Sequence, residues 1–283
     1  MTNDFPSHLV APILDAAFAE DLGLSGDITT NAIIPAAESS QAVIAARKPG
    51  RIAGLPIAEA AFRRLDPGVT FDILINDGGD AHSGDHLAEM VGNTRAILSA
   101  ERIALNFLGH LSGVATHTRA FARAIEGTNA HICCTRKTTP GLRAFEKYAV
   151  RMGGGMNHRF GLFDAVLIKD NHVAAAGGIG PAITRARQAV GHLIKIEVEV
   201  DRLDQLEEAL RYKIDAALLD NMSLDDLRRA VAMAAGRVIL EASGGVTLGT
   251  VRAIAETGVD LISSGALTHS SPALDVGLDF PAG

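Results

Sequence analysis

The chain has 283 residues, with 26 Lys and Arg against 33 Asp and Glu and a formal net charge of −7. This acidic balance argues against a nucleic-acid-binding or membrane-surface protein, because both usually present a broad basic face. Hydrophobic residues make up 47% of the chain, enough for a large core, and no apolar run is long enough to span a membrane. The opening MTNDFPSHLV lacks the pattern of a secretory signal, so the cytoplasm is the expected location.

The first part of the chain, up to about residue 112, predicts a mixture of helices and short strands. A helical opening at 8–23 precedes three short runs that favour strands, separated by glycine and aspartate turns. These runs are 41–50, 69–79 and 86–93. An apolar-periodic helix follows over 93–113, with Asn93 or Thr94 as its N-cap, and we interpret it as the connection between two domains.

Two stretches resemble a metal site or a redox site, but a structural role explains each of them. DGGDAHSGDH, at 77–86, holds five potential ligands without the spacing of a calcium or zinc motif, so a surface turn is favoured. The only two cysteines, Cys133 and Cys134, are adjacent, and neighbouring strand residues point to opposite faces. We therefore expect no disulfide between them and interpret both as reduced, apolar strand residues.

From about residue 131, short aliphatic and β-branched runs alternate with helical segments. The six runs are HICCTRKT, AVLIKDN, LIKIEVEVD, AALLDNM, VILEASGG and LISSGAL. This alternation predicts a parallel sheet with crossover helices, either a barrel or a doubly wound sheet. Each run ends in polar or glycine residues, which favours the barrel, because active sites gather at the carboxyl ends of barrel strands.

One of these runs has a charged face. Strict alternation in IKIEVEVD places Lys195, Glu197, Glu199 and Asp201 on one side and apolar residues on the other. Strands of a parallel barrel are normally covered on both faces, so charges that point inward need partners or ligands. An edge strand with one solvated face is the alternative.

Cations gather in the stretch from Cys134 to His172. Seven Lys and Arg stand against two acids between Arg136 and Lys169, although the whole chain is acidic. Five cationic residues lie at strand ends or beside the glycine loop GGGMNHR, and they predict a pocket for a small polyanion: Arg136, Lys137, His158, Arg159 and Lys169. The other three are interpreted as ordinary charges on a helix surface: Arg143, Lys147 and Arg151.

Small residues follow the last two strand runs. EASGGVTLGTVRAIAE places them directly before a helix, and ISSGALTHSSP repeats the pattern, so exposed backbone N–H groups there predict a phosphate site. Glu199 and Asp220 stand at strand ends opposite the cations. Carboxylates in such positions can hold ribose hydroxyls or a magnesium ion that itself holds a diphosphate.

The motifs TRKTTPGLR, EKYAV, GGGMNHR, LIKDNH, EVEVD, LLDN, EASGG and GALTHS, with GDITT and AERIALNFLGHLSGVAT before them, occur in this order. In this pattern the chain resembles the quinolinate phosphoribosyltransferase family over nearly its whole length. The resemblance implies an N-terminal α/β sandwich domain at 1–112, rejoined by the C-terminal tail 269–283, and an incomplete α/β barrel at 113–268. It also implies a homodimer with shared active sites, with a hexamer as the alternative.

By this resemblance, the two quinolinate carboxylates would be bound by Arg136, His158, Arg159 and Lys169, with Arg102 reaching in from the neighbouring subunit. The diphosphate would lie by Lys137, the ribose and a magnesium ion by Glu199 and Asp220, and the 5′-phosphate by Ser243, Gly244, Gly245, Ser264, Gly265 and Ala266. Thr135 completes the substrate-binding set, and the catalytic set is Lys137, Lys169, Glu199 and Asp220. Two positions depart from the family pattern: Cys134 stands where an acid is common, and Ser264 where valine is common.

The implied reaction joins quinolinate to phosphoribosyl diphosphate, with loss of diphosphate and CO2, to give the NAD precursor nicotinate mononucleotide. Mg²⁺ would accompany the diphosphate, and no organic cofactor is expected, because the quaternised ring itself accepts the electron pair. Three alternatives stay open. They are a paralogue of the kind associated with molybdenum transport, an aldolase with Lys169 as a Schiff-base lysine, and a non-catalytic phosphosugar-binding protein.

Overall fold

The computed structural model of the chain describes residues 5–281. Met1–Asp4, which open the expected N-terminal domain, and Ala282–Gly283, at the end of the expected tail, lie outside this range. Contacts divide the chain into two compact units, which consist of the described parts of 1–119, 139–154 and 270–283, and of 120–138 and 155–269. Within 5–281, no helix combines the length and apolarity that crossing a bilayer requires.

The first unit is built on a four-stranded antiparallel sheet in the order β12-β1-β5-β3. The strands are β1 (Ser39–Ala46), β3 (Thr70–Ile73), β5 (His86–Asn93) and β12 (Val276–Asp279). β12 pairs with β1 in a register that sets Val43 opposite Asp279, so the end of the chain returns to the sheet at its beginning. A two-stranded sheet pairs β2 (Gly50–Arg51) with β4 (Asp80–Ala81).

Helices complete the first unit. They are η1 (Ser7–Leu9), α1 (Val10–Leu22), α2 (Ile28–Ile33), α3 (Leu55–Leu65) and α5 (Arg143–Met152). α3 is amphipathic, since Leu55, Ile57 and Phe62 are among its buried residues while Arg63 is exposed. The Asp27 side chain caps α2 by accepting from the Thr30 N–H at 2.9 Å.

The helix predicted over 93–113 is confirmed and continues further. α4 (Thr94–Ala124) is a single helix of 31 residues, and the division between the two units falls within it, after Arg119. Its first turn is capped by Asn93, whose side-chain oxygen accepts from the Ala96 N–H at 3.2 Å.

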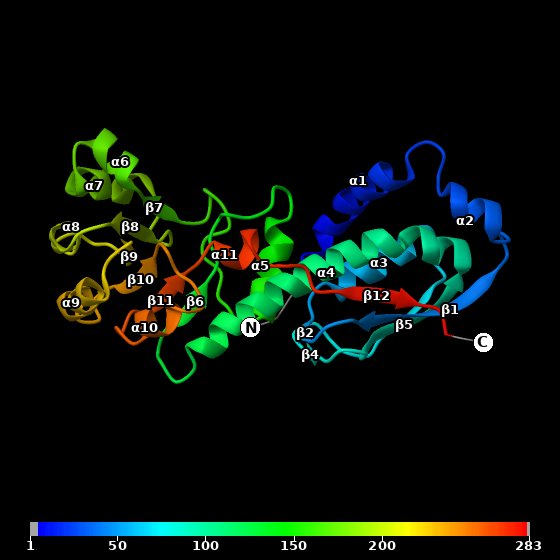
Figure 1. Ribbon diagram of the computed structural model, residues 1–283. Helices are drawn as coiled ribbons and strands as arrows, with labels where there is room; N and C mark the ends of the chain where they lie inside the picture. Colours follow the sequence, from blue (N-terminus) through cyan, green and yellow to red (C-terminus); the bar gives the residue numbers. More distant parts are fainter. Residues whose placement is uncertain (1–4, 282–283) are drawn as a thin grey trace. The chain divides into compact units, whose positions relative to one another are not determined.

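The second unit contains the six predicted strands in one parallel sheet, in the order β6-β11-β10-β9-β8-β7 (Figure 1). The strands are β6 (His131–Cys133), β7 (Val166–Ile168), β8 (Ile196–Val200), β9 (Ala216–Asp220), β10 (Ile239–Ser243) and β11 (Leu261–Ser263). The strand order follows the chain from β7 to β11 without the reversal of a doubly wound sheet. Because β6 and β7 are the two edges, the barrel is incomplete, as expected.

Helices alternate with these strands. They are α6 (Asp170–Ala176), α7 (Ile179–Ala189), α8 (Leu203–Ala209), α9 (Leu224–Ala234), α10 (Val251–Ala255) and α11 (Ala266–His269). β8 contacts α7 and α8, and its apolar residues Ile196, Val198 and Val200 are buried. β8 lies between β9 and β7, so the edge-strand alternative for this run is wrong.

α5 corrects one expectation. Lys147 is fully buried, so its interpretation as a surface charge is wrong. The helix is packed on every side, since all residues from Phe145 to Val150 are buried. Its neighbour Glu146, also fully buried, accepts from the Thr139 N–H at 3.1 Å and lies 2.8 Å from His110 Nε2. The sequence pattern of α5 does not reveal this full enclosure, because it depends on elements distant along the chain.

Candidate active site

A cavity of about 800 Å³ opens at the carboxyl ends of the parallel strands. Every residue of the predicted substrate-binding set lines it, with the exception of Arg102. These residues are Thr135, Arg136, Lys137, His158, Arg159, Lys169, Glu199, Asp220, Ser243, Gly244, Gly245, Ser264, Gly265 and Ala266. All of them except His158 and Arg159 follow or end a strand of one parallel sheet, and the carboxyl ends of these strands meet at a single mouth.

The segment before β7 reaches this mouth by pairing with the edge of β6. Met156 forms an isolated parallel bridge with Cys133, and its N–H donates to the Ile132 carbonyl at 2.8 Å. His158 and Arg159, which follow this bridge, therefore lie at the cavity although they belong to no strand. This bridge places His158 and Arg159 beside the residues that end β6.

The two arginines of the cavity have unused hydrogen-bonding capacity. Within 5–281, the Nε atoms of Arg136 and Arg159 are buried and meet no hydrogen-bond acceptor. Arg159 uses Nη1 to donate to the Ala165 carbonyl at 2.9 Å. Burial, together with the charge of Arg136, lowers the pKa of Arg159 from its usual value. Two partly desolvated guanidinium groups side by side favour the binding of an anion.

Lys169 and Glu199 are 30 residues apart along the chain but meet in the cavity. The Lys169 Nζ donates to Glu199 Oε2 in an ion pair. A contact with a carboxylate differs from the apolar surroundings that a Schiff-base lysine needs. The aldolase alternative is therefore disfavoured.

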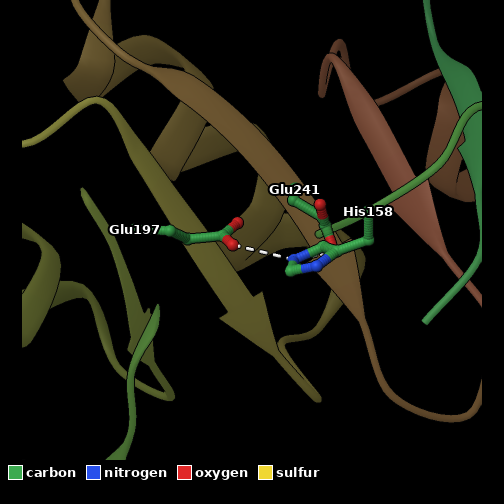
Figure 2. A group of neighbouring side chains, drawn as sticks. All are labelled: His158, Glu197 and Glu241. Carbon is green, nitrogen blue, oxygen red and sulfur yellow. Dashed lines mark hydrogen bonds and ion pairs between the residues drawn. The ribbon is translucent and has the colours of Figure 1, made fainter. Parts of the chain in front are cut away.

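The side chains of His158, Glu197 and Glu241 form a cluster, and only His158 belongs to the predicted substrate-binding set (Figure 2). His158 Nε2 lies 2.9 Å from Glu197 Oε2 and 3.9 Å from Glu241 Oε1. Glu241 is 2% exposed, and burial, with the negative charge of Glu197, raises its pKa to about 7. Glu197 had a detectable signal, since it shares the charged face of its strand with Glu199. The only sequence feature that could have indicated Glu241 is its position near the end of a predicted strand.

The glycine turn after β10 is closely packed at Gly244, whereas nothing lies within 4 Å of a Cβ on Gly245. Gly244 and Gly245 have φ angles of +93° and +59°, a region that favours glycine. A Cβ on Gly244 would lie 2.1 Å from Asn221 Oδ1. The expectation that this turn directly precedes a helix is wrong, because α10 begins only at Val251.

The turn after β11, unlike the one after β10, leads directly into a helix. Gly265 is followed at once by α11, and a Cβ on Gly265 would lie 2.8 Å from Cδ of Lys137. Lys137 thus packs against the small residues that end the sheet. The close approach explains the glycine, and it brings a lysine next to backbone N–H groups.

The two positions that depart from the family pattern are buried. Cys134 is fully buried, and its thiol lies 3.3 Å from Asn157 Oδ1. Cys133 is buried as well, and the two cysteines form no disulfide. Ser264 is also buried, with its hydroxyl 3.5 Å from the Val246 carbonyl.

Arg102 does not line the cavity of its own chain. It lies on α4 in the first unit and is exposed, as is Asn106 one turn later. Arg102 and Asn106 therefore form an accessible polar strip on this helix. The sequence analysis also missed cavity residues that follow the strands without a charge to mark them, among them Asn221 and Thr247.

Comparison with known protein families assigns both parts of the chain. Residues 27–112 match the model of the quinolinate phosphoribosyl transferase N-terminal domain, and residues 114–279 match that of the C-terminal domain. The chain belongs to the quinolinate phosphoribosyltransferase family. The expected family is thereby confirmed, and with it the class of enzyme, a pentosyltransferase.

Relatives of known name agree over most of the chain. A probable nicotinate-nucleotide pyrophosphorylase (carboxylating) of Bacillus subtilis is 45% identical over 96% of this chain and 94% of its own. A mitochondrial quinolinate phosphoribosyltransferase (decarboxylating) of Nicotiana glauca is 42% identical over 96% of this chain and 82% of its own. The solved nicotinate-nucleotide pyrophosphorylase of Francisella tularensis is 40% identical and superposes with a TM-score of 0.94, covering 98% of each chain.

Proposed function

We propose that the protein transfers the phosphoribosyl group of phosphoribosyl diphosphate to quinolinate and releases diphosphate and CO2, forming nicotinate mononucleotide. The names of its relatives support this reaction. The observation that carries it in the structure is the pair of buried guanidinium Nε atoms of Arg136 and Arg159, which have no acceptor among the described residues. Such groups are costly until an anion binds them.

Quinolinate would occupy the cationic side of the cavity. Its two carboxylates need several charge-assisted donors, and Arg136, His158, Arg159 and Lys169 line that side. Nicotinate has one carboxylate fewer, so it would leave part of this buried charge unpaired. We therefore expect the site to reject nicotinate.

Phosphoribosyl diphosphate would bind across the remaining strand ends. The backbone N–H groups of the turns at 243–245 and 264–266 suit its 5′-phosphate, and Lys137 beside the second turn suits its diphosphate. Glu199 and Asp220 can accept hydrogen bonds from the ribose hydroxyls. The residues that would bind phosphoribosyl diphosphate are therefore distinct from the arginines that would bind quinolinate.

The chemistry follows from these positions. The pyridine nitrogen attacks C1 of the ribose while the bond from C1 to diphosphate breaks, and positive charge develops on the sugar, where Glu199 and Asp220 stabilise it. The bond between C2 of the ring and its carboxylate then breaks, and CO2 leaves. The electron pair stays at C2 beside the quaternised nitrogen, and a proton from the solvent completes the product.

Mg²⁺ fits this site by the chemistry of its donors. The two strand-end carboxylates, Glu199 and Asp220, line the same cavity, and carboxylate oxygens are preferred magnesium ligands. A magnesium ion held there, directly or through water, would neutralise charge on the departing diphosphate. No organic cofactor is included in the proposal.

We extend the proposal to a homodimer, with a hexamer as the alternative assembly. Arg102 is exposed on α4 and does not line the cavity of its own chain. We propose that it completes the site of a neighbouring copy. A cytoplasmic location and the domain boundary at 112/113 stay predictions.

One assay tests the reaction. Purified protein is incubated with quinolinate, phosphoribosyl diphosphate and Mg²⁺, and diphosphate, CO2 and nicotinate mononucleotide are measured together; we expect equal amounts of the three. A parallel reaction with nicotinate should give little product, and comparable turnover of nicotinate would contradict the proposed pocket. Binding of phosphoribosyl diphosphate without diphosphate release would indicate a phosphosugar-binding protein instead.

A further inference from the structure

Glu241 is a buried carboxyl group on the cavity side of β10. It is 2% exposed, and the Ser263 hydroxyl hydrogen-bonds to its carboxyl group. Its other oxygen, Oε1, has no hydrogen-bond partner among residues 5–281. Oε1 faces the imidazole of His158 at 3.9 Å from Nε2 (Figure 2).

The same imidazole nitrogen contacts a second carboxylate. His158 Nε2 lies 2.9 Å from Glu197 Oε2, and both side chains are nearly buried, at 12% and 13% exposed. A lone pair on Nε2 would face two acceptor oxygens, whereas a hydrogen on Nε2 can be donated to Glu197 Oε2 at 2.9 Å. The hydrogen on Nε2 is compatible with the neutral Nε2–H tautomer and with the imidazolium, and the negative charge of Glu197 favours the imidazolium. An ionised Glu241 would add a second negative charge beside it.

We propose that Glu241 is a positioning residue that acts through His158: together with Glu197 it holds this side chain as an oriented imidazolium, ready to bind a carboxylate of the substrate. The inference rests on the proposed function, and it assigns a role to a residue outside the predicted substrate-binding set. Glu241 itself is not proposed to touch the substrate. It would determine how well His158 does so.

The charged groups around Glu241 define its pH dependence. Those that face it are Glu197 on β8, His158 in the segment after the Met156 bridge, and Cys134 next to β6. Burial and the charge of Glu197 raise the pKa of Glu241 to about 7, against the opposing effect of His158. Above that pH the ionised Glu241 adds a second negative charge beside the imidazolium. His158 is thus expected to keep its proton to a higher pH in the wild type than in a variant without this carboxylate.

A bound metal is the competing use of the cluster. The three ligand atoms lie within 4.8 Å of one another. Arg159 contributes a positive charge that interacts with Glu197, and Arg136 is close enough to Arg159 to lower its pKa. These cations oppose a metal ion at this place, so the ion-pair role is favoured.

The first experiment compares Glu241→Gln with the wild type. Quinolinate affinity is measured by calorimetry, and kcat/KM for quinolinate and KM for phosphoribosyl diphosphate are measured from pH 6 to 9. We expect the alkaline limb of the quinolinate profile to move down by about one pH unit, equivalent to about a tenfold loss at pH 8. KM for phosphoribosyl diphosphate should change by less than about twofold, since this substrate does not bind through His158.

A double-mutant cycle tests whether Glu241 acts through His158. In a His158→Gln background, Glu241→Gln should cause no further loss of quinolinate affinity. Glu146→Gln is the matched control, because Glu146 is another fully buried glutamate beside a histidine, outside the cavity. It is expected to lower thermal stability without moving the pH profile. Ser263→Ala removes the hydroxyl bonded to Glu241 and should shift the pH profile in the same direction as Glu241→Gln, but by less. It is the variant to use if Glu241→Gln does not fold.

Three outcomes would overturn the inference. They are an unchanged pH profile in Glu241→Gln, fully additive losses in the double variant, and stoichiometric zinc or manganese in the wild type that Glu241→Gln loses. Failure of the proposed function has a different signature, because wild-type protein would then release no diphosphate at any pH. The calorimetric measurement with quinolinate still tests the role of Glu241 in that case.

Discussion

Lys169 and Glu199 form an ion pair inside the cavity, although 30 residues separate them along the chain. Lys169 follows β7, Glu199 lies near the end of β8, and these two strands are neighbours in the parallel sheet. In this contact each neutralises the charge of the other. A carboxylate that binds Lys169 and a ribose that binds Glu199 would replace this mutual contact, so the pair links the two proposed halves of the site.

Lys169→Ala is expected to reduce kcat/KM for quinolinate by at least about tenfold while the fold is kept. The substitution removes a proposed carboxylate ligand and leaves Glu199 as an unpaired negative charge where a dianion must bind. Lys195→Ala is the control, because the Lys195 ammonium is paired with Asp215, its side chain is 76% exposed, and it does not line the cavity. Circular dichroism and melting temperature check the fold, and equal losses in both variants would mean that the cavity assignment is wrong.

Gly244→Ala is expected to raise KM for phosphoribosyl diphosphate by about tenfold or more, with a smaller effect on quinolinate. Its φ of +93° disfavours a side chain, and the new Cβ would meet Asn221 Oδ1 at 2.1 Å, so the turn at 243–245 must move. Gly236→Ala is the control that distinguishes backbone strain from displacement of the turn. Gly236 also has a positive φ, +73°, but nothing lies within 4 Å of a Cβ there. The control should cost about 1–2 kcal/mol of stability and leave both KM values unchanged.

Asp215→Asn is expected to destabilise the protein at pH 7 and much less at pH 2. Burial raises the pKa of Asp215, but hydrogen bonds from the Ile196 N–H, Lys195 and Arg187 outweigh it and lower the pKa from 3.8 to about 2. A carboxyl group whose pKa is depressed by folding stabilises the fold above its unfolded pKa, and this contribution is lost as pH falls through the folded value. Melting temperatures of variant and wild type between pH 2 and pH 7 should therefore converge toward acid. A constant difference across this range would contradict the assignment.

Arg102→Ala and Lys169→Ala are expected to complement one another if Arg102 completes the site of a neighbouring copy. In a mixed dimer, the subunit with Arg102→Ala keeps its own Lys169 and receives an intact Arg102 from its partner. Random pairing makes half the dimers mixed and half of their sites whole, so refolding equal amounts together should restore roughly a quarter of wild-type activity. Mass measurement must show subunit exchange. Activity no higher than that of the separate variants would exclude the shared site.

The amino-acid sequence alone was sufficient for the family, the six parallel strands and 14 of the 22 residues that line the cavity. These features are local or periodic: aliphatic runs predict strands, and a polar residue at the end of each run needs only the geometry of parallel strands to reach the common mouth. Strict alternation in β8 likewise predicted that Glu197 and Glu199 share one face, and both have cationic or histidine partners there.

The tertiary structure decided what depends on contacts between distant segments. Full burial of Lys147 and Glu146 follows from the packing around α5, and neither residue differs in its local pattern from a surface charge. The approach of Glu241 to His158 arises because β10 lies two strands from β8 and the segment with His158 bridges to β6. Burial, and the pKa shift that it causes, is a property of the surrounding volume, and a one-dimensional pattern of residues does not contain it.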